Sequence, residues 1–368
     1  MNKTGFGFLR LPKAECNGKE VIDIELLCRL VDQFLGMGGS YFDTAYTYLN
    51  GESETALRRT LVERHPRDSF RIATKLPSYR VKKPDDCWKF FNEQIERCGV
   101  TFFDVYLLHW LNRENYAIAQ KMEEFNFLRR LKAEGLARKI GFSYHDSAEL
   151  LDEILTQHPD LDYVQLQINY LDWDSEAIQS RKCYQVAVKH GVDVIVMEPV
   201  KGGTLSTLPH EAEALLRSHR PDASLSSWAI RFAQSLPQVS IVLSGMNAPE
   251  QVIDNMSPHP DLTEYELELL KQVCKIKRAA TAVPCTGCAY CTTHCSRQIP
   301  IPRYFSLYNE YSQSPTEDWK MQHLYDTLSL TGGKASDCVR CRQCEKNCPQ
   351  GIPITEHLKG VAKTFENN

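Results

Sequence analysis

Eight of the chain's 14 cysteines lie between residues 285 and 348, where they form two copies of the spacing CxxCxxCxxxC. The copies are offset by 53 residues at every cysteine: Cys285, Cys288, Cys291 and Cys295, then Cys338, Cys341, Cys344 and Cys348. The match continues beyond the cysteines, since Ile299-Pro300-Ile301 corresponds to Ile352-Pro353-Ile354. An internal duplication of this kind predicts a compact module organised around its cysteines.

The spacing within each copy favours iron–sulfur clusters over zinc. Zinc sites with four cysteines commonly use two CxxC pairs separated by a loop. Three cysteines at three-residue steps are typical of the bacterial ferredoxin run, in which the fourth cysteine ligates the other cluster. We therefore predict two [4Fe–4S] clusters, with zinc or free thiols as alternatives. The expected ligand sets are Cys285, Cys288 and Cys291 with Cys348, and Cys338, Cys341 and Cys344 with Cys295.

The sequence before the first clustered cysteine alternates short apolar runs with amphipathic segments, the pattern of an α/β fold. Helix-length segments such as 20–37 carry apolar residues at helical spacing. No GxGxxG loop follows the first apolar run, as a doubly wound dinucleotide-binding sheet would require. We predict a closed (β/α)₈ TIM barrel with strands at 5–9, 40–43, 69–75, 103–109, 139–143, 163–168, 193–197 and 239–244.

Length and composition agree with a barrel followed by a small, mainly helical ferredoxin-like module. The 368 residues accommodate one barrel of about 250 residues and one such module, with expected domains 1–278 and 279–368. A net charge of −4 argues against a nucleic-acid binder. No apolar run is long enough for a membrane span, and the first ten residues lack the apolar core of a signal peptide. We expect a cytoplasmic protein.

Polar residues end several of the predicted strands. Asp43, Lys75 and His109 end three consecutive ones, Ser143 ends the next, Gln165 lies on the sixth, and the seventh runs into Met197-Glu198. In a TIM barrel, the carboxyl ends of the strands converge on one mouth, which is where catalytic residues lie. The alternative is that Asp43 and Lys75 form a buried ion pair that only braces the barrel.

These residues also resemble a known family. Phe42-Asp43-Thr44-Ala45-Tyr46-Thr47-Tyr48, followed by Gly51-Glu52-Ser53-Glu54, is similar to the aldo-keto reductase signature. Ala73-Thr74-Lys75, Leu107-Leu108-His109, Gly141-Phe142-Ser143 and Gln165 follow in the family's order. The resemblance covers roughly residues 4–278. It implies a TIM barrel, a nicotinamide cofactor across the mouth, and a catalytic tetrad of Asp43, Tyr48, Lys75 and His109.

The chemistry of carbonyl reduction fits this tetrad. Hydride addition leaves negative charge on the carbonyl oxygen, so a proton donor must lie nearby. Tyr48 would be that acid, with its pKa lowered by the Lys75 ammonium, which Asp43 holds in place. His109 would donate a hydrogen bond to the carbonyl oxygen and orient it.

The same resemblance implies cofactor contacts from Ser143, Gln165, Met197, Gly245 and Asn255. Ser143 and Gln165 would bind the nicotinamide carboxamide, and Met197 would pack on the ring where the family often has an aromatic residue. The segment 244–251 lacks the Lys or Arg with which many family members bind the 2′-phosphate of NADP. We therefore expect NADH to bind at least as tightly as NADPH, unless Arg10, Arg58 or Lys201 reaches the phosphate instead.

These observations predict an iron–sulfur-containing oxidoreductase that reduces an aldehyde or ketone, or catalyses the reverse, with NAD(H) or NADP(H). Its partner would then be a small-molecule carbonyl substrate. An alternative is an electron-transfer protein whose clusters exchange electrons with a ferredoxin or flavodoxin. In a third reading the clusters are structural or sense oxygen. No nucleic-acid or membrane partner is expected.

Overall fold

The computed structural model describes residues 3–16, 18–175, 178–258, 260–313 and 318–366. The chain divides into two compact units. The first contains Met1–Ser175, Gln179–Pro199 and Ser227–Leu262, and the second contains Glu176–Ile178, Val200–Ser226 and Thr263–Asn368. None of the described helices is long and apolar enough to cross a membrane.

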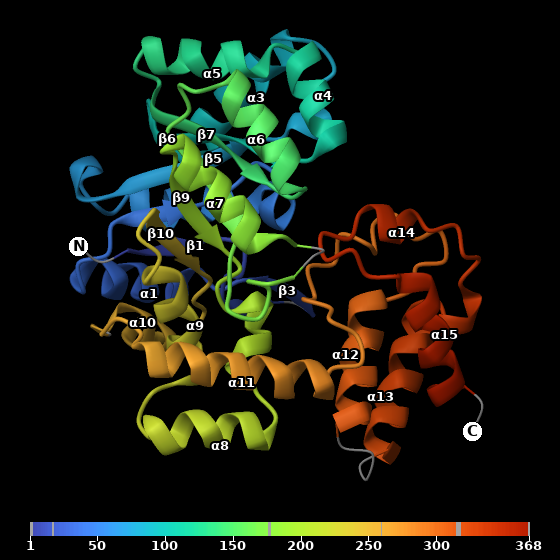
Figure 1. Ribbon diagram of the computed structural model, residues 1–368. Helices are drawn as coiled ribbons and strands as arrows, with labels where there is room; N and C mark the ends of the chain where they lie inside the picture. Colours follow the sequence, from blue (N-terminus) through green and yellow to red (C-terminus); the bar gives the residue numbers. More distant parts are fainter. Residues whose placement is uncertain (1–2, 17, 176–177, 259, 314–317, 367–368) are drawn as a thin grey trace. The chain divides into compact units, whose positions relative to one another are not determined.

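Within the described residues, eight parallel strands of the first unit close into a barrel in the order β1-β10-β9-β8-β7-β6-β5-β4 (Figure 1). Pairing of β1 with both β4 and β10 closes the ring. The predicted TIM barrel is therefore confirmed. The strands are β1 (Thr4–Gly7), β4 (Tyr41–Asp43), β5 (Arg71–Leu76), β6 (Phe103–Leu111), β7 (Ala137–Tyr144), β8 (Tyr163–Gln167), β9 (Asp193–Met197) and β10 (Val239–Ser244).

The inside of the barrel is a packed core and not a channel. Its buried side chains alternate along the strands with outward-facing ones, as the pleat requires. They are Tyr41, Ala73, Val105, Leu107, Ile195, Ile241 and Leu243, with Tyr163 packed against them. Because apolar side chains fill the interior, polar side chains from different strands can meet only at the ends of the barrel.

Helices surround the barrel. They are α1 (Ile24–Gly36), α2 (Glu52–Leu57), α3 (Asp85–Cys98), α4 (Arg113–Lys121), α5 (Glu124–Ala133), α6 (Ala148–Gln157), α7 (Ser180–His190), α9 (Leu225–Gln234) and α10 (Pro249–Met256). Phe34 of α1 packs edge-on against Phe6 and Phe42, with ring centroids 5.5 and 5.3 Å apart. These contacts fix α1 against neighbouring strands β1 and β4.

The expected helical segment 20–37 is partly wrong. Lys19–Ile22 forms strand β3, which pairs antiparallel with β2 (Lys13–Cys16). Helix α1 begins at Ile24, where the Asp23 carboxylate accepts a hydrogen bond from the Leu26 amide at 2.8 Å. Such a cap satisfies an amide that has no partner within the helix. The hairpin and this cap together move the helix start later than the apolar spacing suggested.

The second unit is mainly helical. It contains α8 (His210–His219), α11 (Glu264–Ala280), α12 (Ile301–Gln313), α13 (Asp318–Thr331), α14 (Gln343–Lys346) and α15 (Ile354–Phe365). Its core includes Tyr304, Phe305, Tyr325, Leu358 and Phe365, with Cys291 and Cys344 among the buried residues. Figure 1 shows α12, α13 and α15 side by side, with the cysteine-bearing segments beyond their ends. The helical ferredoxin-like character predicted from the sequence agrees with this architecture.

Candidate functional site

The structure brings Asp43, Lys75 and Tyr48 together at the barrel mouth. Asp43 ends β4, Lys75 lies near the end of β5, and Tyr48 begins the short helix η1 (Tyr48–Gly51) that follows β4. The Lys75 ammonium donates to Asp43 Oδ1 at 2.6 Å and to the Thr44 carbonyl at 2.8 Å. It also donates to the Tyr48 hydroxyl at 3.5 Å. Lys75 therefore connects a carboxylate to a phenol.

Burial dominates the electrostatics of this ion pair. Asp43 is 2% exposed and Lys75 is fully buried. Burial lowers the pKa of Lys75 and raises the pKa of Asp43, and the attraction between the two opposes both shifts. Neither charge would be stable alone in this environment, because desolvating one unpaired ion costs several kcal/mol.

The Tyr48 phenol differs from the expectation drawn from the sequence. Burial raises its pKa well above the ordinary value, and the carboxylates of Asp43 and Glu198 raise it further. Arg10 opposes the shift. The expected lowering by Lys75 does not prevail, because a buried phenolate loses more hydration than one ammonium at 3.5 Å returns. Tyr48 is therefore held protonated, as a proton donor must be.

His109 lies beside Tyr48. The two rings are 5.7 Å apart between centroids and nearly perpendicular, at 76°. Burial lowers the pKa of His109 well below its ordinary value, and the Lys75 charge and His145 lower it further. The imidazole is therefore neutral at neutral pH. Among the described residues, its buried Nδ1 has no hydrogen-bond partner.

The candidate nicotinamide contacts Ser143 and Gln165 lie on β7 and β8, adjacent strands that place the two residues directly opposite each other. Ser143 Oγ accepts a hydrogen bond from the Trp110 amide at 2.8 Å, which leaves its hydroxyl proton for another acceptor. The buried Gln165 Oε1 has no partner within the described part of the chain. An amide group could donate to Gln165 and accept from Ser143, so the pair fits a carboxamide.

The remaining predicted cofactor residues lie at the ends of β9 and β10. Met197 is the last residue of β9 and is half-buried. Gly245 follows β10, and a side chain there would lie 3.2 Å from Arg10 Cβ. The Asn255 amide of α10 donates to Ser244 Oγ at 2.9 Å. Asn255 is thus tied to the end of β10, beside the segment expected to bind the cofactor.

Two charged residues at this mouth, Glu198 and Arg10, were noted in the sequence without a settled role. Glu198 directly follows Met197 and has a left-handed backbone, with φ of 57°. Its carboxylate pairs with Arg10 at 3.4 Å, while its buried Oε2 has no hydrogen-bond partner among the described residues. Its position at the end of the seventh predicted strand placed Glu198 at the mouth but did not indicate the pairing with Arg10. Of the three bases considered for the 2′-phosphate, Arg10 lies beside Gly245, whereas Arg58 pairs with Glu63.

Glu54, noted in the sequence only as part of the signature, supports the strand that carries Lys75. Its fully buried carboxylate accepts hydrogen bonds from Thr74 Oγ1 at 2.8 Å and Gln94 Nε2 at 2.7 Å. Gln94 Nε2 also donates to the Lys75 carbonyl at 3.2 Å. This buried network fixes the backbone on both sides of the Lys75 Cα.

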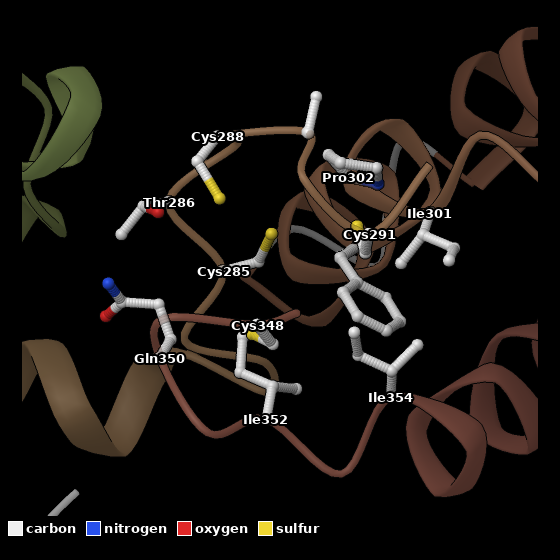
Figure 2. A pocket seen from close by; sticks show the side chains of 12 residues that line it. Cys285, Thr286, Cys288, Cys291, Ile301, Pro302, Cys348, Gln350, Ile352 and Ile354 are labelled. Atoms are coloured by element: carbon white, nitrogen blue, oxygen red, sulfur yellow. The ribbon is translucent and has the colours of Figure 1, made fainter. Parts of the chain in front are cut away.

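In the second unit, Cys285, Cys288, Cys291 and Cys348 line one pocket (Figure 2). These are the four residues that the ferredoxin run assigns to one cluster. The pKa of the Cys285 thiol is raised to about 11, mainly by burial and also by neighbouring Cys288 and Cys348, while the Gly287 amide and Lys201 oppose the rise. The Gly287 amide donates to Cys285 Sγ at 3.4 Å, the kind of contact that stabilises a cluster thiolate.

The second expected ligand set, which consists of Cys338, Cys341, Cys344 and Cys295, is less enclosed than the first. The pKa of the Cys344 thiol is raised to about 11, mainly by burial and also by Cys338, Glu345 and Cys295. Cys295 of the first copy therefore lies within electrostatic range of the second. Cys341 is exposed. Among the described residues, no three His, Cys, Asp or Glu side chains converge closely enough to ligate a single metal ion.

Lys201 was noted in the sequence only as a distant base. It is 2% exposed, has φ of 50°, and its ammonium donates to Gln350 Oε1 at 3.0 Å. Gln350 lines the same pocket as Cys285 and Cys348 (Figure 2). No sequence pattern indicated this contact, which joins residues 149 positions apart.

Comparisons with known proteins agree with both parts of the chain. The model of the aldo/keto reductase family matches residues 4–275, and that of a 4Fe-4S dicluster domain matches residues 284–353. An aldo-keto reductase of Mycolicibacterium vanbaalenii is 25% identical over 268 residues, which cover 72% of this chain and 83% of the relative. A putative voltage-gated potassium channel subunit beta of Schizosaccharomyces pombe is 24% identical over 303 residues, covering 70% and 86%.

Solved structures share the barrel fold. An aldo-keto reductase from Bacillus halodurans in its holo form has a TM-score of 0.60 and 22% identity, and covers 74% of this chain and 91% of that one. A Klebsiella pneumoniae aldo/keto reductase in complex with NADP and acetate has a TM-score of 0.60 and 17% identity, with coverage of 73% and 90%.

Proposed function

Because this chain belongs to the aldo/keto reductase family and carries a 4Fe-4S dicluster domain, which makes it an oxidoreductase, we propose that it reduces an aldehyde or ketone, or catalyses the reverse. NADH or NADPH would be the hydride carrier. The observation that carries this proposal is the Lys75 ammonium, which contacts both Asp43 Oδ1 and the Tyr48 hydroxyl. The barrel at 1–278 would hold this chemistry, and residues 279–368 the clusters.

The residues at the ends of β7 and β8 fit a nicotinamide. Gln165 Oε1, buried and without a partner in the described chain, would accept from its carboxamide nitrogen, and the Ser143 hydroxyl would donate to its oxygen. Each such bond contributes about 1 kcal/mol, and leaving Gln165 Oε1 unpaired costs more. The bound nicotinamide supplies the hydride chemistry.

Tyr48 is the proton donor in this proposal. Burial keeps its phenol protonated, and Lys75 stabilises the phenolate that forms as the proton moves to the carbonyl oxygen. Asp43 keeps Lys75 charged and aimed at Tyr48. Neutral His109 donates a hydrogen bond to the same carbonyl oxygen, which holds the substrate in place as negative charge develops.

Replacing the acid tests the proposal. Wild-type protein, purified without oxygen, is assayed for NADH and NADPH oxidation against a panel of aliphatic and aromatic aldehydes and ketones. Tyr48→Phe should lower the turnover rate by about 10²–10⁴, the range typical of a lost general acid. Nicotinamide affinity, measured by fluorescence, should stay nearly unchanged because Tyr48 is not among the proposed carboxamide contacts.

Tyr46→Phe is the matched control. Tyr46 precedes Tyr48 by two residues in the chain. Its hydroxyl donates to Glu93 Oε2 at 2.6 Å, and neither residue belongs to the tetrad. Tyr46→Phe should therefore keep wild-type turnover. Normal turnover by Tyr48→Phe on a substrate that wild type reduces would refute the assignment of the acid.

A second candidate function is electron transfer. It is supported by the match to a 4Fe-4S dicluster domain and by four cysteines around one pocket. In this case two [4Fe–4S] clusters would exchange single electrons with a ferredoxin or flavodoxin. Anaerobic titrations with reduced flavodoxin and with NADH or NADPH separate the possibilities, since bleaching of cluster absorbance shows which of these donors passes electrons to the clusters. Clusters that are only structural or oxygen-sensing would not bleach.

A further inference from the structure

The two cysteine repeats share an unusual backbone but differ in the residues that adopt it. In the first repeat, Gly287 and Ala289 flank Cys288 and have φ of 72° and 64°. The corresponding Arg340 and Arg342 flank Cys341, and both have φ of 56°. The left-handed conformation therefore occurs at the same two positions in each copy.

Arginine is an unfavourable choice for this conformation. A residue with a Cβ is strained at positive φ, whereas glycine adopts it readily. The first repeat makes the same turn with glycine and alanine, so the fold does not require arginine at either position. The difference in strain concerns Arg340, which stands where the first repeat has Gly287, whereas Ala289 and Arg342 both carry a Cβ and differ in side-chain length and charge. The long charged side chains therefore indicate a role that differs between the repeats.

The second repeat is also more exposed and more positively charged around its middle cysteines than the first. Cys341 is exposed, whereas its counterpart Cys288 is half-buried. The Arg342 side chain is 68% exposed, and neighbouring Val339 is 53% exposed. Residues 334–346 contain four basic and two acidic side chains, whereas the matching residues 281–293 contain none of either. Two acids face these arginines: Glu345 lies 3.7 Å from Arg342, and Glu356 interacts electrostatically with both Arg340 and Arg342. Glu356 also pairs with Lys359, which offsets its charge.

We propose that Val339, Arg340, Cys341 and Arg342 form a docking surface for a small acidic protein that carries single electrons. The proposal rests on the proposed [4Fe–4S] cluster at Cys338, Cys341, Cys344 and Cys295. The reduced carrier would lose one electron, and the oxidised cluster would gain it on the side where Cys341 is exposed. The same surface serves the reverse transfer.

Charge complementarity selects an acidic partner. The chain carries a net charge of −4, so an acidic protein is repelled on average. A local basic surface around the exposed ligand attracts such a protein and orients it with its redox centre near Cys341. Steering of this kind raises association rates by about 10- to 1,000-fold, and salt weakens it.

The test exchanges the second repeat's residues for those of the first. Arg340→Gly/Arg342→Ala should fold, because glycine and alanine adopt this backbone in the first repeat. Reduced bacterial flavodoxin, an acidic FMN protein, is mixed with the oxidised holoprotein, and cluster bleaching is followed by stopped-flow absorbance. At about 0.01 M salt the double variant should react about tenfold more slowly than wild type. The difference should vanish near 1 M salt, where charges are screened within about 3 Å.

Two control variants test whether the effect depends on positive charge at positions 340 and 342 in particular. Arg340→Lys/Arg342→Lys keeps both charges and should react within about twofold of wild type. Arg217→Ala/Lys271→Ala removes two exposed charges from α8 and α11, which carry no cluster cysteine, and should also retain the wild-type rate. A slow rate in this second control would attribute the effect to net charge and overturn the docking surface.

Other outcomes also contradict the proposal. An unchanged rate for Arg340→Gly/Arg342→Ala would overturn it, as would a slower rate that is insensitive to salt and accompanied by a shifted midpoint potential. Arginine-dependent binding of single-stranded oligonucleotides, with no effect on flavodoxin, would assign the surface to another partner. Failure of the underlying cluster assignment is distinct, because wild-type protein would then contain no iron and sulfide and would not bleach at all.

Discussion

The Lys201 ammonium lies 3.0 Å from Gln350 Oε1, at the edge of the pocket lined by Cys285, Cys288, Cys291 and Cys348. Both residues belong to the second compact unit, although Lys201 follows barrel strand β9 by only four positions in the chain. The reduction potential of an iron–sulfur cluster depends on nearby charge, because the reduced cluster is more negative. Lys201 therefore adds a positive charge to one of the two expected cluster sites.

Lys201→Met should lower the midpoint potential of the cluster at Cys285, since the reduced state loses a stabilising charge. A tenfold change in a one-electron equilibrium corresponds to 59 mV, and we expect a shift of about that size. Potentiometric titration followed by electron paramagnetic resonance measures it. Lys201→Arg should keep the potential near that of wild type.

The second cluster is an internal control for this experiment, since its potential should not move. Lys277→Met is a matched variant in the same unit, because Lys277 is also buried and donates to the Thr207 carbonyl at 3.2 Å. Equal shifts in Lys201→Met and Lys277→Met would show that Lys201 has no specific effect on the cluster.

The predicted cluster ligation leads to a separate test. Protein purified without oxygen should contain about eight iron and eight sulfide per chain, as two cubanes require. Cys348→Ser should perturb the cluster formed with Cys285, Cys288 and Cys291, whose pocket Cys348 shares, and leave the other spectrum unchanged. Stoichiometric zinc without sulfide, or a defect confined to the cluster at Cys338, would contradict the ligand assignment.

Cofactor preference is testable at α10. The segment 244–251 has no basic residue, so NADH should bind at least as tightly as NADPH. Gln251→Arg, in the first turn of α10, should shift the preference toward NADPH by about 10- to 100-fold, since one charge-assisted hydrogen bond contributes about 1.5–3 kcal/mol. Competition titrations of the two cofactors measure the ratio. Tenfold tighter NADPH binding by wild type would contradict this expectation.

Replacing Arg10 tests whether this residue is the source of any preference for NADPH. Its Cβ lies beside Gly245 and its guanidinium pairs with Glu198, so Arg10 places a positive charge near the expected cofactor segment. If wild type favours NADPH and Arg10→Met reverses that preference, Arg10 supplies the phosphate contact. If Arg10→Met leaves the ratio unchanged, the phosphate is bound elsewhere.

We expect Glu124 to make the stability of the folded chain depend on pH. Burial raises the pKa of this carboxyl to about 7, and the Ser78 hydroxyl, which donates to Glu124 Oε2 at 2.6 Å, partly opposes the rise. A raised pKa in the folded state means that the favourable contribution is complete below about pH 4.5. It is then lost as the pH rises through about 7. The shift corresponds to about 3 kcal/mol.

Glu124→Gln should therefore remove this loss and melt at a higher temperature than wild type at pH 8, with a smaller gain at pH 5. Calorimetry of the holoprotein at several pH values measures the difference. Glu123→Gln changes the exposed neighbouring carboxylate and should leave the pH dependence unchanged. A wild-type melting temperature that does not fall between pH 5 and 8 would refute the role of Glu124.

Much of the barrel was predictable from local sequence. Apolar runs of strand length recur between amphipathic segments, and all eight predicted strands occur in the described barrel. Asp43, Lys75 and His109 could be placed at one mouth because parallel strands of a barrel share their carboxyl ends. The hairpin β2–β3 was not predicted, because short exposed strands lack a periodic apolar pattern.

The sequence by itself determined the repeat, the likeness of its two cysteine patterns, and the order of polar residues along the strands, because each depends only on spacing along the chain. Tertiary structure alone decided the raised pKa of Tyr48, the Arg10–Glu198 pair, and the contact between Lys201 and Gln350. These depend on burial and on distances between residues far apart in sequence. Desolvation and Coulomb energies follow those distances, and no local pattern encodes them.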